Sequence, residues 1–320
     1  MKNTLQSRKV VIVGAGAVGA TFAYALAQDG TAEEIIILDA NEDLAKGQAL
    51  DLGHGRPFMP TASLVTGTAA DYADADVIVI TAGAKQKPGE SRLDLLQRNA
   101  AIMRNICADI NAQQSTAVVV VVSNPVDVLT HVAAVTLQQT TGRVLGSGTV
   151  LDSARFRYLV GDHCGVDLRN VHAYILGEHG DSELPAWSMT HIAGMDIEDY
   201  CAVCGKCDGW QAVRDEIFAQ VRDSAYHIIG YKGATCFAVG LALVRIVKAV
   251  LRNERSVLTV SSLLRGQYGL DNVCLSVPCV VGSNGIERVI EARLNDEEQQ
   301  ALARSAGILK EMTTSVFENE

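Results

Sequence analysis

The first 150 residues of the chain alternate between short apolar runs and longer stretches with apolar positions at helical spacing. The apolar runs predict strands over residues 9–13, 34–38, 76–80 and 117–122. The stretches that follow them predict helices over residues 17–28, 43–52, 92–111 and 126–139. Strands that are apolar on both faces and alternate with helices are typical of a parallel sheet covered on both sides. Right-handed crossovers make such a sheet doubly wound, so we predict a Rossmann-type α/β fold.

The pattern changes after about residue 146, where helices and strands no longer alternate. Helices are predicted over residues 151–160, 208–229, 235–251 and 295–317, and strands over residues 171–176, 257–261, 273–281 and 285–290. Segregated elements of this kind indicate an α+β domain. We therefore predict two domains, a Rossmann-type domain over residues 1–148 and an α+β domain over residues 149–320.

Composition and charge narrow the classes of protein that this chain can be. Apolar residues are 48% and charged residues 20% of the 320 residues, a balance that excludes an intrinsically disordered chain. The net charge of 27 − 37 = −10, without a basic run, argues against a nucleic-acid partner. No apolar stretch reaches the roughly 18 residues of a membrane span. The longest, residues 240–251, contains Arg245 and Lys248, so we expect no membrane partner either.

The N-terminal segment and the cysteines bear on cellular location. Residues 1–9 are polar and lead directly into the first predicted strand, so they lack the apolar core of a signal peptide. The eight cysteines show no secreted disulfide framework, and we expect reduced thiols. Both observations favour a cytoplasmic protein.

A glycine-rich turn follows the first predicted strand. Gly14, Gly16 and Gly19 have the G-x-G-x-x-G spacing, in which the glycines permit a tight turn, close approach of a pyrophosphate and close packing of helix on strand. Asp39 ends the second predicted strand, where a carboxylate binds a ribose 2′-hydroxyl and repels a 2′-phosphate. A structural glycine turn with a capping aspartate is the alternative. The combination of strand, spacing and acid favours an NAD site.

Two segments supply candidate acid–base chemistry. His179 lies between glycines in Gly-Glu-His-Gly, just past the predicted strand 171–176, which suits a general acid–base. Asp152 and Arg155 are three residues apart and share one face of a predicted helix. A buried carboxylate can orient an imidazole and raise its pKa, and an arginine can bind a substrate carboxylate. An ion pair on a solvated helix face is the alternative interpretation.

Two further segments follow predicted strands of the first half. Residues 82–93 contain Gly83, Pro88 and Gly89, which suggest a mobile loop, and a lid bearing Arg92 could exclude water and polarise a carbonyl. An ordinary polar loop is the alternative. Asn124 follows the strand at 117–122 and is placed to hydrogen-bond substrate and nicotinamide.

The segments GESRL, SNPVD, LDSARFR and GEHGDS, together with the glycine turn, occur in order and closely resemble the NAD-dependent L-lactate dehydrogenases of bacterial type. The resemblance runs from about residue 10 to residue 317. It implies that His179 exchanges a proton with pyruvate and lactate, that Asp152 is its partner, and that Arg155 binds the substrate carboxylate. It also implies that Arg92 polarises the carbonyl, while Asn124 and Thr235 contact substrate and Val239 backs the nicotinamide.

The resemblance also implies a set of NAD contacts and no metal. The cofactor-binding residues are expected to be Gly14, Gly16, Val18, Gly19, Asp39, Tyr72, Gly83, Ala84, Asn105, Val122, Asn124 and Ser147. Asn105 departs from the serine common in related bacterial chains. Hydride comes from the cofactor and a proton from a histidine, so the chemistry requires no metal.

Gln86 separates pyruvate from oxaloacetate as the substrate. In similar malate dehydrogenases an arginine at this loop position pairs with the second carboxylate of oxaloacetate. Gln86 is neutral, and an unpaired carboxylate under a closed loop would cost several kcal/mol. The flanking Lys85 and Lys87 weaken this argument. We predict pyruvate, with a malate or other 2-hydroxy-acid dehydrogenase as the alternative enzyme and a non-catalytic NAD-binding protein as the alternative class.

Arg157 and His172 match the fructose 1,6-bisphosphate positions of allosteric bacterial lactate dehydrogenases, which are tetramers with the effector at a subunit interface. Arg157 lies about 200° around the helix from Arg155 and should face away from the catalytic pocket. Non-allosteric relatives carry the same pair, so activation by the bisphosphate remains one of two alternatives. The resemblance predicts a homotetramer that reduces pyruvate in glycolysis and fermentation.

The segment from Cys201 through Cys204 to Cys207 has C-x-x-C-x-x-C spacing, which resembles part of a zinc or iron–sulfur ligand run. No fourth cysteine follows at a suitable spacing. We interpret it as a helix–helix connection with three free thiols.

Overall fold

The computed structural model describes residues 7–85, 89–206 and 210–318. Its helices are α1 (Ala17–Asp29), α2 (Glu42–His54), α3 (Arg92–Ala112), α4 (Val126–Thr136), α5 (Val150–Cys164), α6 (Ile197–Cys204), α7 (Trp210–Lys232), α8 (Phe237–Leu251) and α9 (Asp296–Phe317). Its longer strands are β1 (Lys9–Val13), β2 (Glu34–Leu38), β3 (Ser63–Thr66), β4 (Val77–Ile80), β5 (Val118–Val121), β6 (Val144–Gly146), β12 (Ser256–Arg265), β13 (Asp271–Gly282) and β14 (Gly285–Val289). Two-residue strands are β7 (Val171–His172), β8 (Ile175–Leu176), β9 (Leu184–Pro185), β10 (His191–Ile192) and β11 (Met195–Asp196).

One sheet of nine strands organises the molecule, in the order β14-β13-β12-β6-β5-β4-β1-β2-β3. The strands from β3 to β6 are parallel and have the doubly wound order, which confirms the predicted Rossmann-type fold. The hairpins of β12, β13 and β14 continue the same sheet in antiparallel fashion. The junction is a single residue pair, Ser261 with Gly146, so the sheet crosses the predicted border between the two halves.

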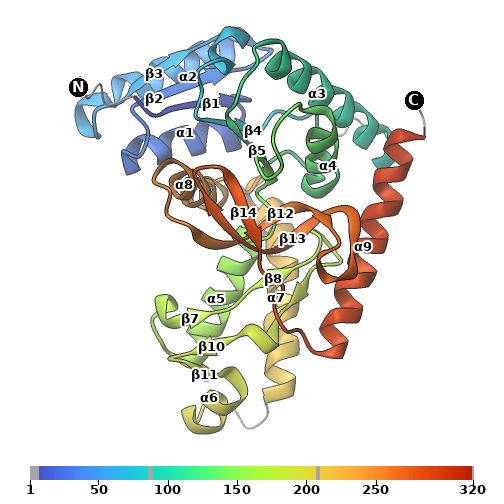
Figure 1. The fold of residues 1–320 in the computed structure, drawn as a ribbon. Helices are drawn as coiled ribbons and strands as arrows, with labels where there is room; N and C mark the ends of the chain where they lie inside the picture. Colours follow the sequence, from blue (N-terminus) through green and yellow to red (C-terminus); the bar gives the residue numbers. More distant parts are fainter. Residues whose placement is uncertain (1–6, 86–88, 207–209, 319–320) are drawn as a thin grey trace, which may run out of the picture.

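The sequence explains why the central strands are buried on both faces. β1, β4 and β5 consist almost entirely of valine and isoleucine, and all their residues are buried. Helices α1 and α8 pack against each other beside this sheet (Figure 1). A second core of Phe156, Val160, Ile175, Ile217 and Val221 joins α5 to α7 in the lower part of Figure 1. α9 runs along one side of the molecule and connects the two parts.

Three local predictions differ from the structure. Residues 171–176 form two short strands in different sheets, because β7 pairs with β10 whereas β8 pairs with β9. β3 and β6 were not predicted, since β3 has two exposed positions and β6 has three residues. Cys201 and Cys204 lie within helix α6 rather than in a connection, which corrects that interpretation, and Cys207 lies outside the described residues.

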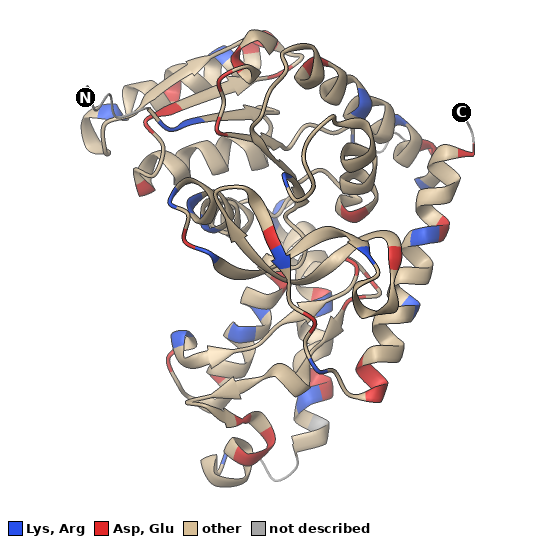
Figure 2. Cartoon of the chain, viewed as in Figure 1, with Lys and Arg blue, Asp and Glu red and all other residues tan. Residues whose placement is uncertain are grey.

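The surface of the described residues carries charges of both signs. Figure 2 shows Lys and Arg as well as Asp and Glu distributed over both halves of the molecule. Within the described ranges, no helix has both the length and the apolar character that a membrane crossing requires.

Candidate active site

The turn after β1 shows why glycine stands at three positions. Gly14 has φ 114°, and a Cβ there would lie 2.6 Å from Thr81 Oγ1. A Cβ on Gly19 would lie 1.8 Å from the carbonyl oxygen of Gly14, so α1 could not approach β1 with any other residue. Gly16 differs, because a Cβ there would meet no neighbouring atom within 4 Å and the residue is exposed at the start of α1. The turn therefore presents bare backbone amides at a helix N-terminus, which is suited to a pyrophosphate.

Asp39 follows β2 and faces the same turn. Its carboxylate accepts hydrogen bonds from the backbone N–H of Ala15 (2.7 Å) and of Asn41 (2.8 Å). These bonds fix the carboxylate at the edge of a cavity of about 850 Å³. A fixed acid at this position accepts hydrogen bonds from a ribose and repels a 2′-phosphate. The residues present therefore fit NAD.

The cavity beside the turn includes half of the predicted cofactor residues. Gly14, Gly16, Asp39, Tyr72, Gly83 and Ala84 line it. Val18, Gly19, Asn105, Val122, Asn124 and Ser147 lie outside its lining. The cavity is also lined by residues 66–69 and by the α3 side chains Ile102 and Ile106, none of which was predicted from the sequence. Ile102 and Ile106 lie about one helical turn apart and form an apolar wall. Their helical spacing was the only signal, and it also fits ordinary core packing.

Asn99 joins two of the predicted segments. Its side-chain oxygen accepts a hydrogen bond from the N–H of Ala84 at 2.8 Å, and its amide nitrogen donates to the carbonyl of Asn124 at 3.1 Å. Asn99 itself is 4% exposed, and both bonds are partly buried. The loop after β4 and the loop after β5 are thereby held side by side. No local pattern indicates this role, since a single asparagine on a long helix is common.

His179, Asp152 and Arg155 come together as predicted. The Nδ1 atom of His179 lies 2.6 Å from Asp152 Oδ2, and Arg155 donates to Asp152 Oδ1 at 2.7 Å. The Asp152 side chain is 3% exposed, whereas those of Arg155 and His179 are 14% and 28% exposed. Asp152 and Arg155 are therefore not an ion pair on a solvated helix face. Asp152 is a buried carboxylate that positions two partly exposed groups, the His179 imidazole and the Arg155 guanidinium.

Burial and charge act in opposite directions on these groups. Burial by itself lowers the pKa of His179, but the charge and hydrogen bond of Asp152 outweigh it and raise the pKa to about 9. Burial likewise opposes ionisation of Asp152, yet His179 and Arg155 hold its pKa below the ordinary value. At neutral pH the centre therefore consists of an imidazolium, a carboxylate and a guanidinium.

Asp127 is a further acid at this centre that the sequence analysis passed over. It is 2% exposed and accepts hydrogen bonds from the backbone N–H of His179 (2.8 Å) and from the hydroxyl of Ser261 (2.6 Å). Burial raises the pKa of Asp127 to about 6, although these two bonds stabilise its anion. Asp127 lies within the SNPVD segment, where Asn124 alone had been singled out.

The segment that carries His179 is held from two further sides. Gly177 exchanges two backbone hydrogen bonds with Ser276 of β13, at 2.9 and 2.8 Å. The hydroxyl of Ser305 on α9 accepts from the N–H of Glu178 at 2.8 Å and lies 3.0 Å from the hydroxyl of Ser182. Ser182 in turn donates to the Glu178 carboxylate. The backbone around the histidine is thus fixed by β13 and α9.

The remaining predicted substrate residues lie farther from this cluster. Arg92 is exposed at the start of α3, and no hydrogen bond or ion pair joins it to His179 or Arg155 within the described residues. Thr235 lies half-buried between α7 and α8, with Val239 on the first turn of α8. Gln86 lies outside the described residues.

Arg157 and His172 lie next to each other on another face. Arg157 donates from Nε to the carbonyl of Val171 at 2.9 Å, and His172 is the following residue, exposed on β7. Arg157 also lines a cavity of about 330 Å³ with Leu241 and Val257, which are 65% and 43% exposed. The cavity lining does not include His179, Asp152 or Arg155.

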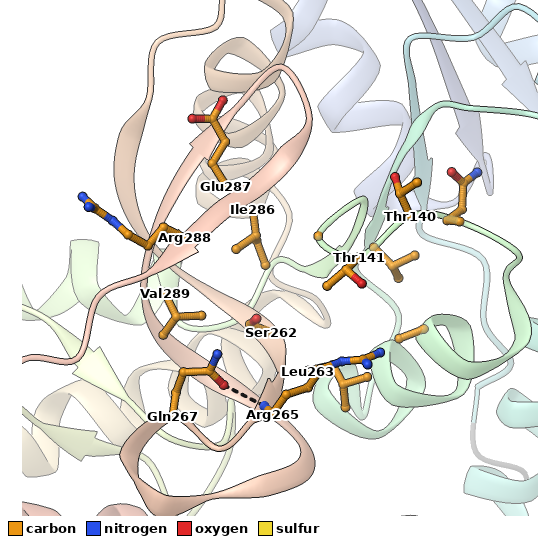
Figure 3. A pocket seen from close by; sticks show the side chains of 14 residues that line it. Thr140, Thr141, Ser262, Leu263, Arg265, Gln267, Ile286, Glu287, Arg288 and Val289 are labelled. Atoms are coloured by element: carbon orange, nitrogen blue, oxygen red, sulfur yellow. Dashed lines mark hydrogen bonds between the residues drawn. The ribbon is translucent and has the colours of Figure 1, made fainter.

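Across residues 7–85, 89–206 and 210–318, no cluster of three His, Cys, Asp or Glu side chains is arranged to hold a metal ion. A cavity of about 190 Å³ lies between β14 and the segment that follows α4 (Figure 3). Thr140 and Thr141 face Ile286 across it, while the Arg288 side chain points away.

Comparisons with known proteins agree with this geometry. Residues 8–146 match the family model for the lactate/malate dehydrogenase NAD binding domain, and residues 149–320 match that for the alpha/beta C-terminal domain. The chain is 57% identical to the L-lactate dehydrogenase of Treponema denticola, covering 97% of this chain and 99% of the relative. It is 54% identical to that of Thermoanaerobacter sp., covering 94% and 97%. A minor L-lactate dehydrogenase from Enterococcus mundtii, in a ligands-bound crystal structure, superposes with a TM-score of 0.94 at 40% identity and 97% and 98% coverage.

Proposed function

The chain belongs to the L-lactate dehydrogenases of the lactate/malate dehydrogenase family, and on that premise we propose that His179, Asp152, Arg155 and Arg92 interconvert pyruvate and L-lactate. The observation that carries the proposal is the buried Asp152 shared by a histidine and an arginine. We also propose a division into a cofactor domain over residues 1–148 and a substrate domain over residues 149–320.

Arg155 binds the substrate carboxylate in this proposal. One of its terminal nitrogens is held by Asp152, which leaves other N–H groups of the guanidinium to donate to the two carboxylate oxygens. The bond to Asp152 fixes the direction of the side chain, so the carboxylate is bound in one orientation. The carbonyl of pyruvate would then lie toward His179.

His179 supplies the proton to the carbonyl oxygen. Its raised pKa keeps it protonated at neutral pH, and Nδ1 is engaged by Asp152, so Nε2 carries the transferred proton. Bound NADH supplies the hydride that reduces the carbonyl carbon. Negative charge develops on the oxygen during this step, and the imidazolium stabilises it. In the reverse direction neutral His179 accepts the hydroxyl proton of lactate.

The roles of the outer residues are further parts of the proposal. Arg92 adds a second positive charge to the carbonyl oxygen, while Asn124 and Thr235 hydrogen-bond the substrate. The neutral Gln86 favours the methyl group of pyruvate over the second carboxylate of oxaloacetate. The predicted cofactor set completes the NAD site.

We further propose that Arg157 and His172 bind fructose 1,6-bisphosphate at a subunit interface of a homotetramer. Arg157 bonds the carbonyl of the residue that precedes His172, and a guanidinium together with an imidazole can donate hydrogen bonds to a phosphate. The exposed Leu241 and Val257 beside Arg157 support burial of this face against another subunit. Light scattering of the purified enzyme, with and without the bisphosphate, tests the assembly. A cytoplasmic, fermentative role is part of the same proposal.

One experiment tests the substrate and the effector together. NADH oxidation is followed with pyruvate and with oxaloacetate, each with and without fructose 1,6-bisphosphate. We expect a large preference for pyruvate that the bisphosphate enhances, and loss of the enhancement in Arg157→Gln. Pyruvate turnover that is unchanged by the bisphosphate would refute only the proposed activation through Arg157 and His172. A preference for oxaloacetate would refute the role given to Gln86.

A further inference from the structure

A cavity of about 380 Å³ lies beside the segment that carries His179, between α7, β9 and α9. One side is apolar and is formed by Leu184, Pro185, Trp187, Phe218, Ala301 and Ile308. Its volume falls within the range of small-molecule pockets. The lining does not include the catalytic residues His179, Asp152 and Arg155, so this space is separate from the substrate site.

Glu183 lines this cavity and is 7% exposed. Its Oε1 atom has no hydrogen-bond partner within the described residues. Burial, together with the nearby charge of Asp152, raises the pKa of Glu183 to about 9. Burial therefore favours the neutral carboxylic acid, and Oε1 of this group has no described partner. Buried polar groups in native proteins are normally paired, so the group points to an absent acceptor.

Arg214 supplies a second unpaired donor. Its Nε atom is buried and has no hydrogen-bond acceptor in the described part of the chain. The carboxylates of Asp215 and Glu297 lie 3.8 Å from its nitrogens, beyond hydrogen-bond distance, and both are largely exposed. Arg304 on α9 adds another guanidinium to the lining.

Three other acids line the cavity, of which Asp215 and Glu297 are largely exposed and Glu298 is already paired. Glu298 accepts hydrogen bonds from Ser188 and from the N–H of Asn295, at the start of α9. It therefore has no need of a ligand. The cavity of Figure 3 provides a contrast, because none of its lining residues is among the buried polar groups without a partner.

We propose that the cavity between α7, β9 and α9 is a second ligand site that binds a small carboxylate with an apolar body. Arg214, Arg304 and Glu183 offer hydrogen-bond donors to an anionic acceptor, and the wall formed by Trp187 and Phe218 offers contact to an apolar or aromatic body. The site also contacts Ser182 and Ser305, the hydroxyl pair that holds the backbone of the catalytic segment.

The two tryptophans of the chain provide a direct signal for binding. Trp187 lines the cavity, and Trp210 packs edge-to-face on it with ring centroids 5.2 Å apart. All tryptophan fluorescence of the protein therefore comes from this wall. The experiment titrates the full-length enzyme with benzoate at neutral pH and follows that fluorescence. A calorimetric titration repeats the measurement with the substrate site filled by NADH and oxamate, an isostere of pyruvate.

We expect benzoate to bind saturably, with a Kd that changes less than about twofold when NADH and oxamate fill the substrate site. Arg304→Gln, at an exposed position, should weaken benzoate at least about tenfold, whereas Lys310→Gln on the same helix should leave it unchanged. Glu183→Gln keeps a donor and should retain binding within about threefold, and Glu183→Leu should lose it.

Three results would overturn the proposal. They are fluorescence that does not saturate, competition by oxamate, and benzamide binding as tightly as benzoate. Because the readout is binding, its outcome does not depend on whether the enzyme turns over pyruvate.

Discussion

Replacement of Asp152 by asparagine tests whether Asp152 raises the pKa of His179, the proposed acid–base of the reaction. The change keeps the shape of the side chain but removes the charge that raises the pKa of His179. Burial then dominates and should return that pKa to 6.5, its ordinary value, or below. The shift from about 9 to 6.5 is about 2.5 pH units, equivalent to about 3 kcal/mol of preference for the imidazolium.

The consequence for catalysis follows from the protonated fraction. Pyruvate reduction needs protonated His179, so kcat/KM should be constant at neutral pH and fall tenfold per pH unit above about 9. In Asp152→Asn the fall should begin near or below pH 6.5. At pH 7.5 only about one tenth of the variant would be protonated, so kcat/KM should drop at least about tenfold. Lactate oxidation, which needs neutral His179, should show the opposite pH dependence.

The assay is NADH oxidation as a function of pH, with pyruvate well below its KM. Asp162→Asn is the matched control, because Asp162 is an exposed carboxylate on the same helix. Circular dichroism checks that the variant is folded, since Arg155 loses its partner. An unchanged profile in Asp152→Asn, still falling near pH 9, would refute the assignment of the raised pKa to Asp152.

Three further predictions address the cofactor turn and the buried acid. Gly16→Ala should fold normally but bind NADH at least about tenfold more weakly, because its Cβ enters the open space beside the turn. Gly19→Ala should instead lower the melting temperature, because its Cβ overlaps the backbone of Gly14. Thermal melts and NADH titrations separate the two effects, and similar melts for both variants would contradict them. Asp39→Ser should raise kcat/KM for NADPH relative to NADH at least about tenfold, and an unchanged ratio would argue against a ribose role for this acid. Ser261→Ala should lower the free energy of unfolding by about 1–3 kcal/mol in urea melts, because it removes a hydrogen bond to buried Asp127, and a loss below about 0.5 kcal/mol would contradict this.

Local patterns were sufficient for most of the Rossmann half, although they did not predict β3 or β6. β1 and β2 end where their apolar runs end, and α1 begins directly after the glycine turn. His179 could be singled out because flanking glycines mark it, and Asp152 with Arg155 because helical spacing brings them to one face. In these cases the sequence pattern that marks a site residue lies within a few positions of that residue.

The remaining parts of the site depend on contacts between distant residues. Ser261 bonds Asp127 across 134 positions, and Ser305 bonds Glu178 across 127. Neither serine belongs to a motif, and a buried hydroxyl has no periodic signature. The joining of β6 to β12 through one residue pair has no signature in the local sequence, so the continuity of the sheet across the proposed domain border could not be predicted.

The junction between the two halves of the sheet has a consequence for how the enzyme can work. A Cβ on Gly146 would lie 2.4 Å from Thr130 Oγ1 and 2.8 Å from the Cβ of Ser261, so the halves interlock there without room for another side chain. Ser261 then reaches Asp127, which holds the backbone of His179. Rotation of one half against the other would pull the histidine away from this support, so the acid is assembled before any substrate arrives. Chimeras that exchange halves between relatives should therefore stay active only when both sides of this junction are inherited as a matched set.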